Sequence, residues 1–103
     1  MLHQVTADQN QQQLFVSPGD TIQIQLEENP TTGYSWALSD VDPFFTIQRN
    51  DYELIQGVGI GGGGIRTIQL KVEQSGTKTI NLKNWQRWSG DVYQTFTLEV
   101  QSV

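Results

Sequence analysis

The side chains that could carry out covalent or acid–base chemistry are few in this chain, and they form no catalytic group. The 103 residues include one histidine, His3, and no cysteine, which excludes a thiol nucleophile and a thiolate metal site. We expect the chain end around His3 to be frayed, so that no serine has a histidine partner for a triad. The acidic residues are scattered, and we expect them to be solvated: Glu27, Glu28, Asp40, Asp42, Asp51 and Glu53. The sequence therefore indicates a protein that is not an enzyme and uses no metal or cofactor.

Recognition by a pre-ordered loop is a second kind of chemistry, and one polar turn that leads into an aromatic strand favours it. The stretch is Asn29, Pro30, Thr31, Thr32, Gly33, Tyr34, Ser35 and Trp36. Asn29 and Gly33 tolerate left-handed or similar backbone angles, and Pro30 pushes the residue before it towards an extended conformation. Tyr34 and Trp36 are two apart, so we expect them to share one strand face and to anchor the loop. A loop ordered in this way loses little entropy when it docks, which favours a binding role.

A glycine-rich segment, residues 56–64, has six glycines in its last eight positions. A flexible hairpin connection is one interpretation, and a binding loop whose backbone lies directly against a partner is the other. Gly59, Gly61 and Gly64 match the spacing of a dinucleotide-binding motif. We reject that motif because it requires a helix where the pattern predicts a strand.

A third segment, residues 83–91, places two tryptophans around an arginine. We expect Trp85 to continue a strand face and to pack, and Trp88 to be exposed in a loop. Exposed tryptophan and arginine are enriched at interface hot spots, so Trp88 and Arg87 are candidates for binding a partner. A cation–π contact between Arg87 and a tryptophan is the alternative interpretation.

Alternating polar and apolar residues predict β-strands along the whole chain. The clearest are residues 21–26, 67–72, 79–83 and 95–100, and weaker ones are 14–16, 34–38 and 45–52. No segment has the period of a helix. About seven to eight short strands in a chain of this length are typical of an all-β, immunoglobulin-like antiparallel β-sandwich. With no repeat and no linker, residues 1–103 are expected to form a single domain.

The topology of such a sandwich relates the three unusual segments to one another. If residues 21–26 form the second strand, then residues 29–33, 56–64 and 86–91 are the B–C, D–E and F–G connections. All three connections fall at the same end of the sandwich. We therefore expect them to form one surface.

Composition limits the partners of that surface. A net charge of −5 argues against binding to nucleic acid, which needs clustered lysine and arginine. No apolar run approaches a membrane span, so we expect no membrane partner, and we expect the free protein to be a monomer. The first residues lead straight into polar sequence, which indicates no signal peptide. The protein is then secreted or periplasmic if the start methionine replaces a removed signal peptide, and cytoplasmic otherwise.

The three segments together resemble the motifs of the chagasin-type inhibitors of papain-like cysteine proteases. Residues 29–36 match the family pattern N-P-T-T-G-[YF]-x-W throughout. The second pattern, G-x-G-G before a strand, fits residues 59–62 or 61–64, and the later register places Ile68 where the family has an inward aromatic residue. The third pattern, R-P-W followed by a small residue and often glycine, is altered. Residues 86–90 keep the tryptophan, shift the arginine by one position and lack the proline.

The resemblance implies an immunoglobulin-like domain that inhibits these proteases reversibly with three loops in the active-site cleft. It implies that the first loop lies over the catalytic cysteine, that the glycine segment runs along one side of the cleft, and that the tryptophan contacts an aromatic wall on the other. The implied protease-binding residues are Asn29, Pro30, Thr31, Thr32, Gly33, Gly61, Gly62, Gly63, Gly64, Arg87 and Trp88. Without the proline, residues 86–91 are expected to be less pre-ordered.

The alternative function is a non-inhibitory immunoglobulin-like recognition module that binds carbohydrate or protein through the same loops. Trp85, Trp88 and Tyr93 are its candidate platform for stacking on a sugar. This alternative predicts binding to glycans and no effect on cysteine proteases.

Overall fold

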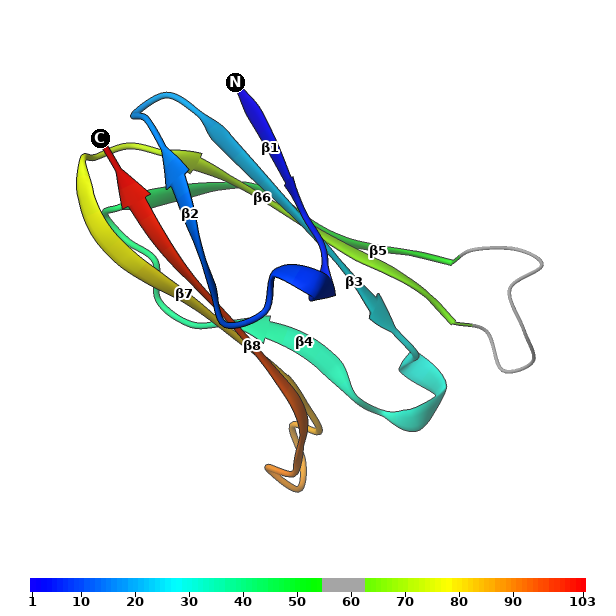
Figure 1. Cartoon of the computed structure of the whole chain (residues 1–103). Helices are drawn as coiled ribbons and strands as arrows, with labels where there is room; N and C mark the ends of the chain where they lie inside the picture. Colours follow the sequence, from blue (N-terminus) through cyan, green and yellow to red (C-terminus); the bar gives the residue numbers. More distant parts are fainter. Residues whose placement is uncertain (55–62) are drawn as a thin grey trace.

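The computed structural model describes residues 1–54 and 63–103, and most of this part of the chain is β-structure (Figure 1). The strands are β1 (Leu2–Val5), β2 (Gln12–Val16), β3 (Thr21–Glu28), β4 (Ser35–Leu38), β5 (Phe45–Leu54), β6 (Gly64–Val72), β7 (Gly76–Trp85) and β8 (Val92–Ser102). Two single 3-10 turns, η1 (Ala7–Gln9) and η2 (Pro30–Thr32), precede β2 and β4. No helix in the described part of the chain is long and apolar enough to cross a membrane.

The strands form two four-stranded sheets, in the orders β1-β3-β6-β5 and β2-β8-β7-β4. The arrangement is an immunoglobulin-like β-sandwich, as the alternating pattern predicts.

The core lies between the sheets and is built from the inward half of each alternating pattern. On β3 the inward residues Ile22, Ile24 and Leu26 are at most 3% exposed. The strands β6, β7 and β8 contribute Ile68, Leu70, Val72, Ile80, Leu82, Phe96, Leu98 and Val100. Removing these apolar surfaces from water is the main force that holds the two sheets together.

The chain start differs from its predicted state. It is paired rather than frayed, because β1 lies along residues 21–24 of β3 and Val5 is 1% exposed. His3 contacts the carboxylate of Asp20, with 2.8 Å between Nε2 and Oδ2. The pairings of β1 with β3 and of β2 with β8 are parallel, whereas the other pairings are antiparallel as expected. These parallel pairs arise because the chain passes from one sheet to the other between β1 and β2, which the alternation within single strands does not encode.

One end of the sandwich, which we call the loop end, carries the β3–β4 loop (29–34), the β7–β8 loop (86–91) and the start of β6. The last residue of β3 pairs with Gly64, and Gly64 also pairs with the last residue of β5. In the other sheet the first residue of β4 pairs with the last residue of β7. The chain termini lie at the opposite end (Figure 1). The prediction that the unusual segments share one end is therefore confirmed for the residues that the structure describes.

Candidate functional site

The β3–β4 loop is ordered by its own side chains. Asn29 is extended (φ −120°, ψ 99°), and its Oδ1 accepts hydrogen bonds from the N–H (3.1 Å) and Oγ1 (2.6 Å) of Thr31. Thr32 Oγ1 donates to the Asn29 carbonyl at 2.7 Å. Gly33 closes the turn with φ 82° and donates its N–H to the Pro30 carbonyl at 3.0 Å. Of the two residues expected to tolerate left-handed angles, only Gly33 adopts them, because Pro30 keeps Asn29 extended.

Trp36 fixes the base of this loop from within β4, where 7% of its surface is exposed. Its backbone N–H donates to Glu28 Oε1 at 2.8 Å, and its indole Nε1 donates to the Glu27 carbonyl at 2.9 Å. Glu28 in turn accepts two hydrogen bonds from Arg66, at 3.1 Å and 2.8 Å. The expectation that Glu28 is solvated is wrong: it is 4% exposed, and its charge is balanced by that of Arg66.

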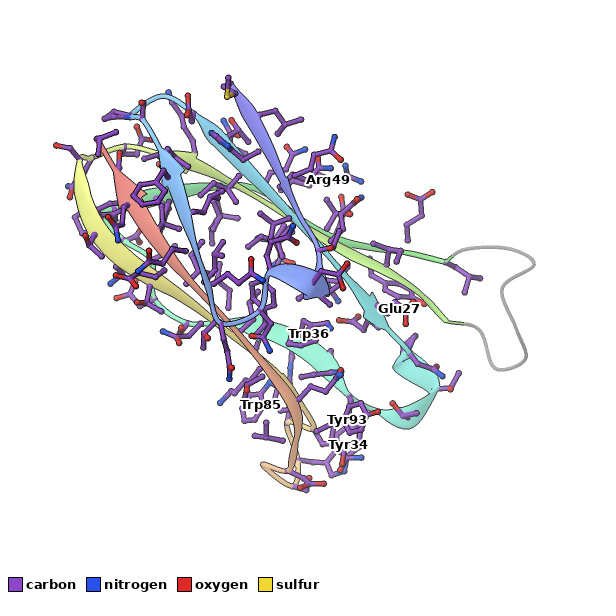
Figure 2. The ribbon with its side chains drawn as sticks, viewed as in Figure 1. Glu27, Tyr34, Trp36, Arg49, Trp85 and Tyr93 are labelled. Atoms are coloured by element: carbon purple, nitrogen blue, oxygen red, sulfur yellow. The ribbon has the colours of Figure 1, made fainter. Side chains whose placement is uncertain are left out.

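Tyr34 connects the loop sideways to β8. Its ring centroid lies 5.7 Å from that of Tyr93, and its hydroxyl donates a hydrogen bond to the Asp91 carboxylate. Figure 2 shows the two tyrosines close together between β4 and the β7–β8 hairpin. The hydrogen bond to Asp91 raises the pKa of Tyr34 above its ordinary value, because an ionised phenol could no longer donate to the carboxylate. The expectation of two aromatics on one strand face holds for Trp36 alone, since Tyr34 precedes β4.

The β7–β8 loop is closed by hydrogen bonds within the loop. Gln86 N–H donates to the Asp91 carbonyl at 2.9 Å, and Gly90 N–H donates to the Gln86 carbonyl at 2.8 Å. Ser89 Oγ donates to Gln86 Oε1 at 2.8 Å and accepts the N–H of Asp91 at 3.1 Å. These four hydrogen bonds constrain the loop even though it lacks the proline of the family pattern.

The two loops also contact each other. Trp88 lies over Gly33 so closely that a Cβ at position 33 would be 2.4 Å from Cη2 and 2.7 Å from Cζ2 of the indole. Gln86 Nε2 donates to the Thr32 carbonyl at 3.1 Å. The tyrosine–carboxylate hydrogen bond described above is the third contact. Trp88 is nevertheless 75% exposed, and Arg87 beside it is exposed as well. The loops therefore form one braced unit that presents an exposed tryptophan in a fixed position.

The tryptophan predictions have two outcomes. Trp85 is half-buried and Trp88 is exposed, as expected. The cation over an indole ring, however, is Lys83 rather than Arg87, with Nζ 3.7 Å from the Trp85 centroid. Two of the three residues proposed to stack on a sugar are therefore engaged within the protein. Lys83 covers one face of Trp85, and Tyr93 packs against Tyr34.

The glycine-rich segment is described from Gly63 onwards, and Gly61 and Gly62 lie outside the described residues. Gly64 is buried at the start of β6, where a Cβ would lie 2.2 Å from the Glu53 carbonyl oxygen. Packing within the sheet therefore requires glycine at position 64. Gly63 is half-buried, and an added Cβ there would meet nothing within 4 Å.

A groove of about 710 Å³, which we call the mouth groove, opens at the loop end. Its lining includes Glu28, Asn29, Thr32, Tyr34, Asn84 and Tyr93. Sequence reasoning missed Glu28 and Asn84 as inward-facing residues. The alternation along each strand could have revealed them. Residues two apart on a strand share a face, so Glu28 points inward like Leu26, and Asn84 points inward like Leu82. The described parts of the chain contain no group of three or more His, Cys, Asp or Glu residues that could hold a metal ion.

Comparison with known proteins places this geometry in a family. The sequence model of the chagasin family of peptidase inhibitors, I42, matches residues 16–100, which include both braced loops. The chain is 33% identical over 96 residues to chagasin of Trypanosoma cruzi, covering 87% of this chain and 86% of chagasin. It is 33% identical over 89 residues to amoebiasin-2 of Entamoeba histolytica, covering 84% of this chain and 72% of amoebiasin-2.

A solved structure agrees with these sequence matches. The crystal structure of the cysteine protease inhibitor EhICP2 from Entamoeba histolytica has a TM-score of 0.88 at 29% identity, covering 99% of this chain and 95% of that chain. Fold, loop motif and sequence thus lead to one family. The chain belongs to the chagasin family of peptidase inhibitors and is an inhibitor rather than an enzyme.

Proposed function

We propose that this chain inhibits papain-like cysteine proteases reversibly by placing its loop end in the active-site cleft, where it blocks access of substrate. Thr31, Thr32 and Gly33 at the tip of the β3–β4 loop lie nearest the catalytic cysteine. Arg87 and Trp88 contact one wall of the cleft. The remaining contacts come from Asn29, Pro30, Gly61, Gly62, Gly63 and Gly64, with the glycine segment along the opposite wall. Residues 1–103 act as a single inhibitor domain.

The observation that carries this proposal is the bracing of the two loops. Trp88 is 75% exposed, yet its ring packs directly against Gly33. Gln86 of the same loop donates a hydrogen bond to the Thr32 carbonyl. Surface residues held in this way lose little entropy when a partner binds, so more of the contact energy appears as affinity. A large, fixed and exposed tryptophan is also the residue type that dominates binding energy at interfaces.

The chemistry of the loop end supports reversible blocking rather than a covalent trap. The chain has no cysteine, and its single histidine is in β1 with its ring against Asp20. The tip offers hydroxyl groups, backbone and an indole, which bind by shape and hydrogen bonding. The relative EhICP2 is named as a cysteine protease inhibitor, which supports the choice of target class. Rigid loop surfaces of this kind form interfaces of about 1,600 Å², with nanomolar affinity being ordinary.

The test is a titration of papain, or of a cathepsin L-like protease, with the purified protein and a fluorogenic peptide substrate. We expect activity to fall at near-stoichiometric inhibitor, to return after dilution, and to be protected by higher substrate concentration. Full activity of both proteases at micromolar protein would overturn the proposal.

A further inference from the structure

Three carbonyl groups of the β3–β4 loop are engaged in hydrogen bonds within the protein. The Asn29 carbonyl accepts the N–H of Thr32 at 3.3 Å and its Oγ1 at 2.7 Å. The Pro30 carbonyl accepts the N–H of Gly33 at 3.0 Å. The Thr32 carbonyl accepts a hydrogen bond from Gln86 Nε2 at 3.1 Å. The first two carbonyls are held from within the loop, whereas the third is held from the β7–β8 loop.

The shape of this loop is unlike that of a peptide bond about to be cut. A protease nucleophile adds to the carbonyl carbon, and the oxygen takes a negative charge that donors of the protease must reach and stabilise. The reacting atoms also have to be aligned at about 3–3.5 Å. Here Pro30–Thr32 form a 3-10 turn, and Gly33 after it has φ 82°. A turned loop whose carbonyl oxygens are already bonded presents a poor target for this attack.

The hold on the Thr32 carbonyl depends on the side-chain amide of Gln86, which directly follows β7 and is half-buried. Both ends of this amide are fixed. Its Nε2 donates to the Thr32 carbonyl, and its Oε1 accepts a hydrogen bond from Ser89 Oγ at 2.8 Å. Because only the nitrogen of an amide can donate to a carbonyl, these partners determine which way the amide points.

We propose that Gln86 is a positioning residue that prevents the target protease from cutting the loop that blocks it. By holding the Thr32 carbonyl towards the β7–β8 loop, its side chain keeps the peptide bond between Thr32 and Gly33 out of reach of the protease. This inference rests on the proposed function, which places these two residues nearest the catalytic cysteine. The bond between the two loops then makes inhibition last, in addition to strengthening it.

The protection can be tested without the target protease by digesting the native protein with subtilisin, a serine protease of broad specificity. Cutting of a native loop follows the population of its opened form. Loss of one ordinary hydrogen bond should therefore speed cuts within residues 29–34 about fivefold. Gln86→Glu keeps the acceptor for Ser89 and loses the donor to Thr32, and Gln86→Met keeps only the length of the side chain. We expect both variants to be cut faster at these positions, so that the effect does not come from the added charge.

Mass spectrometry of the fragments locates the cuts. Gln74→Glu, in an exposed turn at the other end of the sandwich, is the matched control and should be cut at the wild-type rate. Equal rates within residues 29–34 in all four proteins would overturn the proposal. Faster cutting of the Gln86 variants that is spread over the whole chain would overturn it too, because Gln86 would then support the fold in general.

Papain separates this inference from the proposed function. The wild type should stay intact and inhibit papain lastingly. Gln86→Glu should inhibit at first and then release activity, as fragments that begin at Gly33 accumulate. Lasting inhibition by an intact Gln86→Glu would overturn the role of Gln86 and leave the proposed function standing. If the wild type does not inhibit papain but the Gln86 variants are cut faster by subtilisin, the proposed function fails alone.

Discussion

The indole of Trp88 covers Gly33 so closely that a single methyl group at position 33 would come within 2.4 Å of it. The glycine of the first motif is thus required twice, once by its backbone angle (φ 82°) and once by the ring that lies over it. Because the two residues belong to different loops, this contact couples the geometry of one binding segment to that of the other.

Gly33→Ala should therefore damage inhibition more than stability alone explains. The left-handed backbone angle costs alanine about 1–2 kcal/mol, and the methyl group must also displace Trp88. We expect urea unfolding to show a loss of this size and the inhibition constant to rise at least tenfold. Gly19→Ala is the matched control, because Gly19 has φ +94° at the far end of the sandwich and nothing within 4 Å of an added Cβ. A similar loss of inhibition in both variants would contradict the coupling.

Gln86→Ala should loosen the brace without disturbing the core. It removes the hydrogen bond to the Thr32 carbonyl and the acceptor for Ser89 Oγ. Two ordinary hydrogen bonds contribute about 1–3 kcal/mol in all, so we expect affinity for the protease to fall at least about tenfold, mainly through faster dissociation. Gln74→Ala, in an exposed turn at the other end, is the control. Unchanged dissociation by surface plasmon resonance would show that the brace plays no part in binding.

Glu28→Gln should destabilise the fold through the ion pair that supports the loop end. The substitution leaves the Arg66 guanidinium, whose side chain is 20% exposed, without its carboxylate. Removing one partner of a buried pair costs about 3–5 kcal/mol, and we expect about 3 kcal/mol because Arg66 keeps some contact with water. The control is Glu53→Gln, which alters an exposed carboxylate on β5. Equal unfolding free energies for the two variants would refute this role.

The contact between His3 and Asp20 should appear in the acid stability of the protein. The hydrogen bond with His3 is the main reason that the pKa of Asp20 is lowered from 3.8 to about 2. A carboxyl group whose pKa is lower in the folded state stabilises the fold above its unfolded pKa, and this contribution is lost as pH falls towards the folded pKa. The stability advantage of the wild type over Asp20→Asn should thus be complete above about pH 5, fall as the pH drops through 4 towards 2, and be lost at about pH 1. Chemical unfolding at a series of pH values measures it, and an advantage independent of pH would contradict the assignment.

The sequence predicted the strands and the recognition loop because both are local. Period-2 alternation is set by the pleat of a strand, and it marked Ile22, Ile24 and Leu26 as core. The conformation at Asn29 follows from its neighbour Pro30, and that at Gly33 from its lack of a Cβ.

What the sequence did not reveal depends on contacts between distant segments. Trp88 packs against Gly33, and Gln86 donates a hydrogen bond to the Thr32 carbonyl. Both contacts join residues that are more than fifty positions apart in the sequence. Glu28 was expected to be solvated because it is charged, although the alternation on β3 points its side chain inward. Its partner Arg66 comes from another strand, so its charge could not be seen as balanced from the local sequence.

The central claim, that the loop end enters the protease cleft, is tested most directly by comparing two exposed aromatic residues. Trp88 is 75% exposed at the loop end, and Phe15 is 61% exposed on β2. A hot-spot truncation costs at least 2 kcal/mol, or about thirtyfold in affinity. We predict that Trp88→Ala raises the dissociation constant for papain by about this factor, whereas Phe15→Ala leaves it unchanged. Equal dissociation constants for the two variants, or a larger loss for Phe15→Ala, would contradict the account.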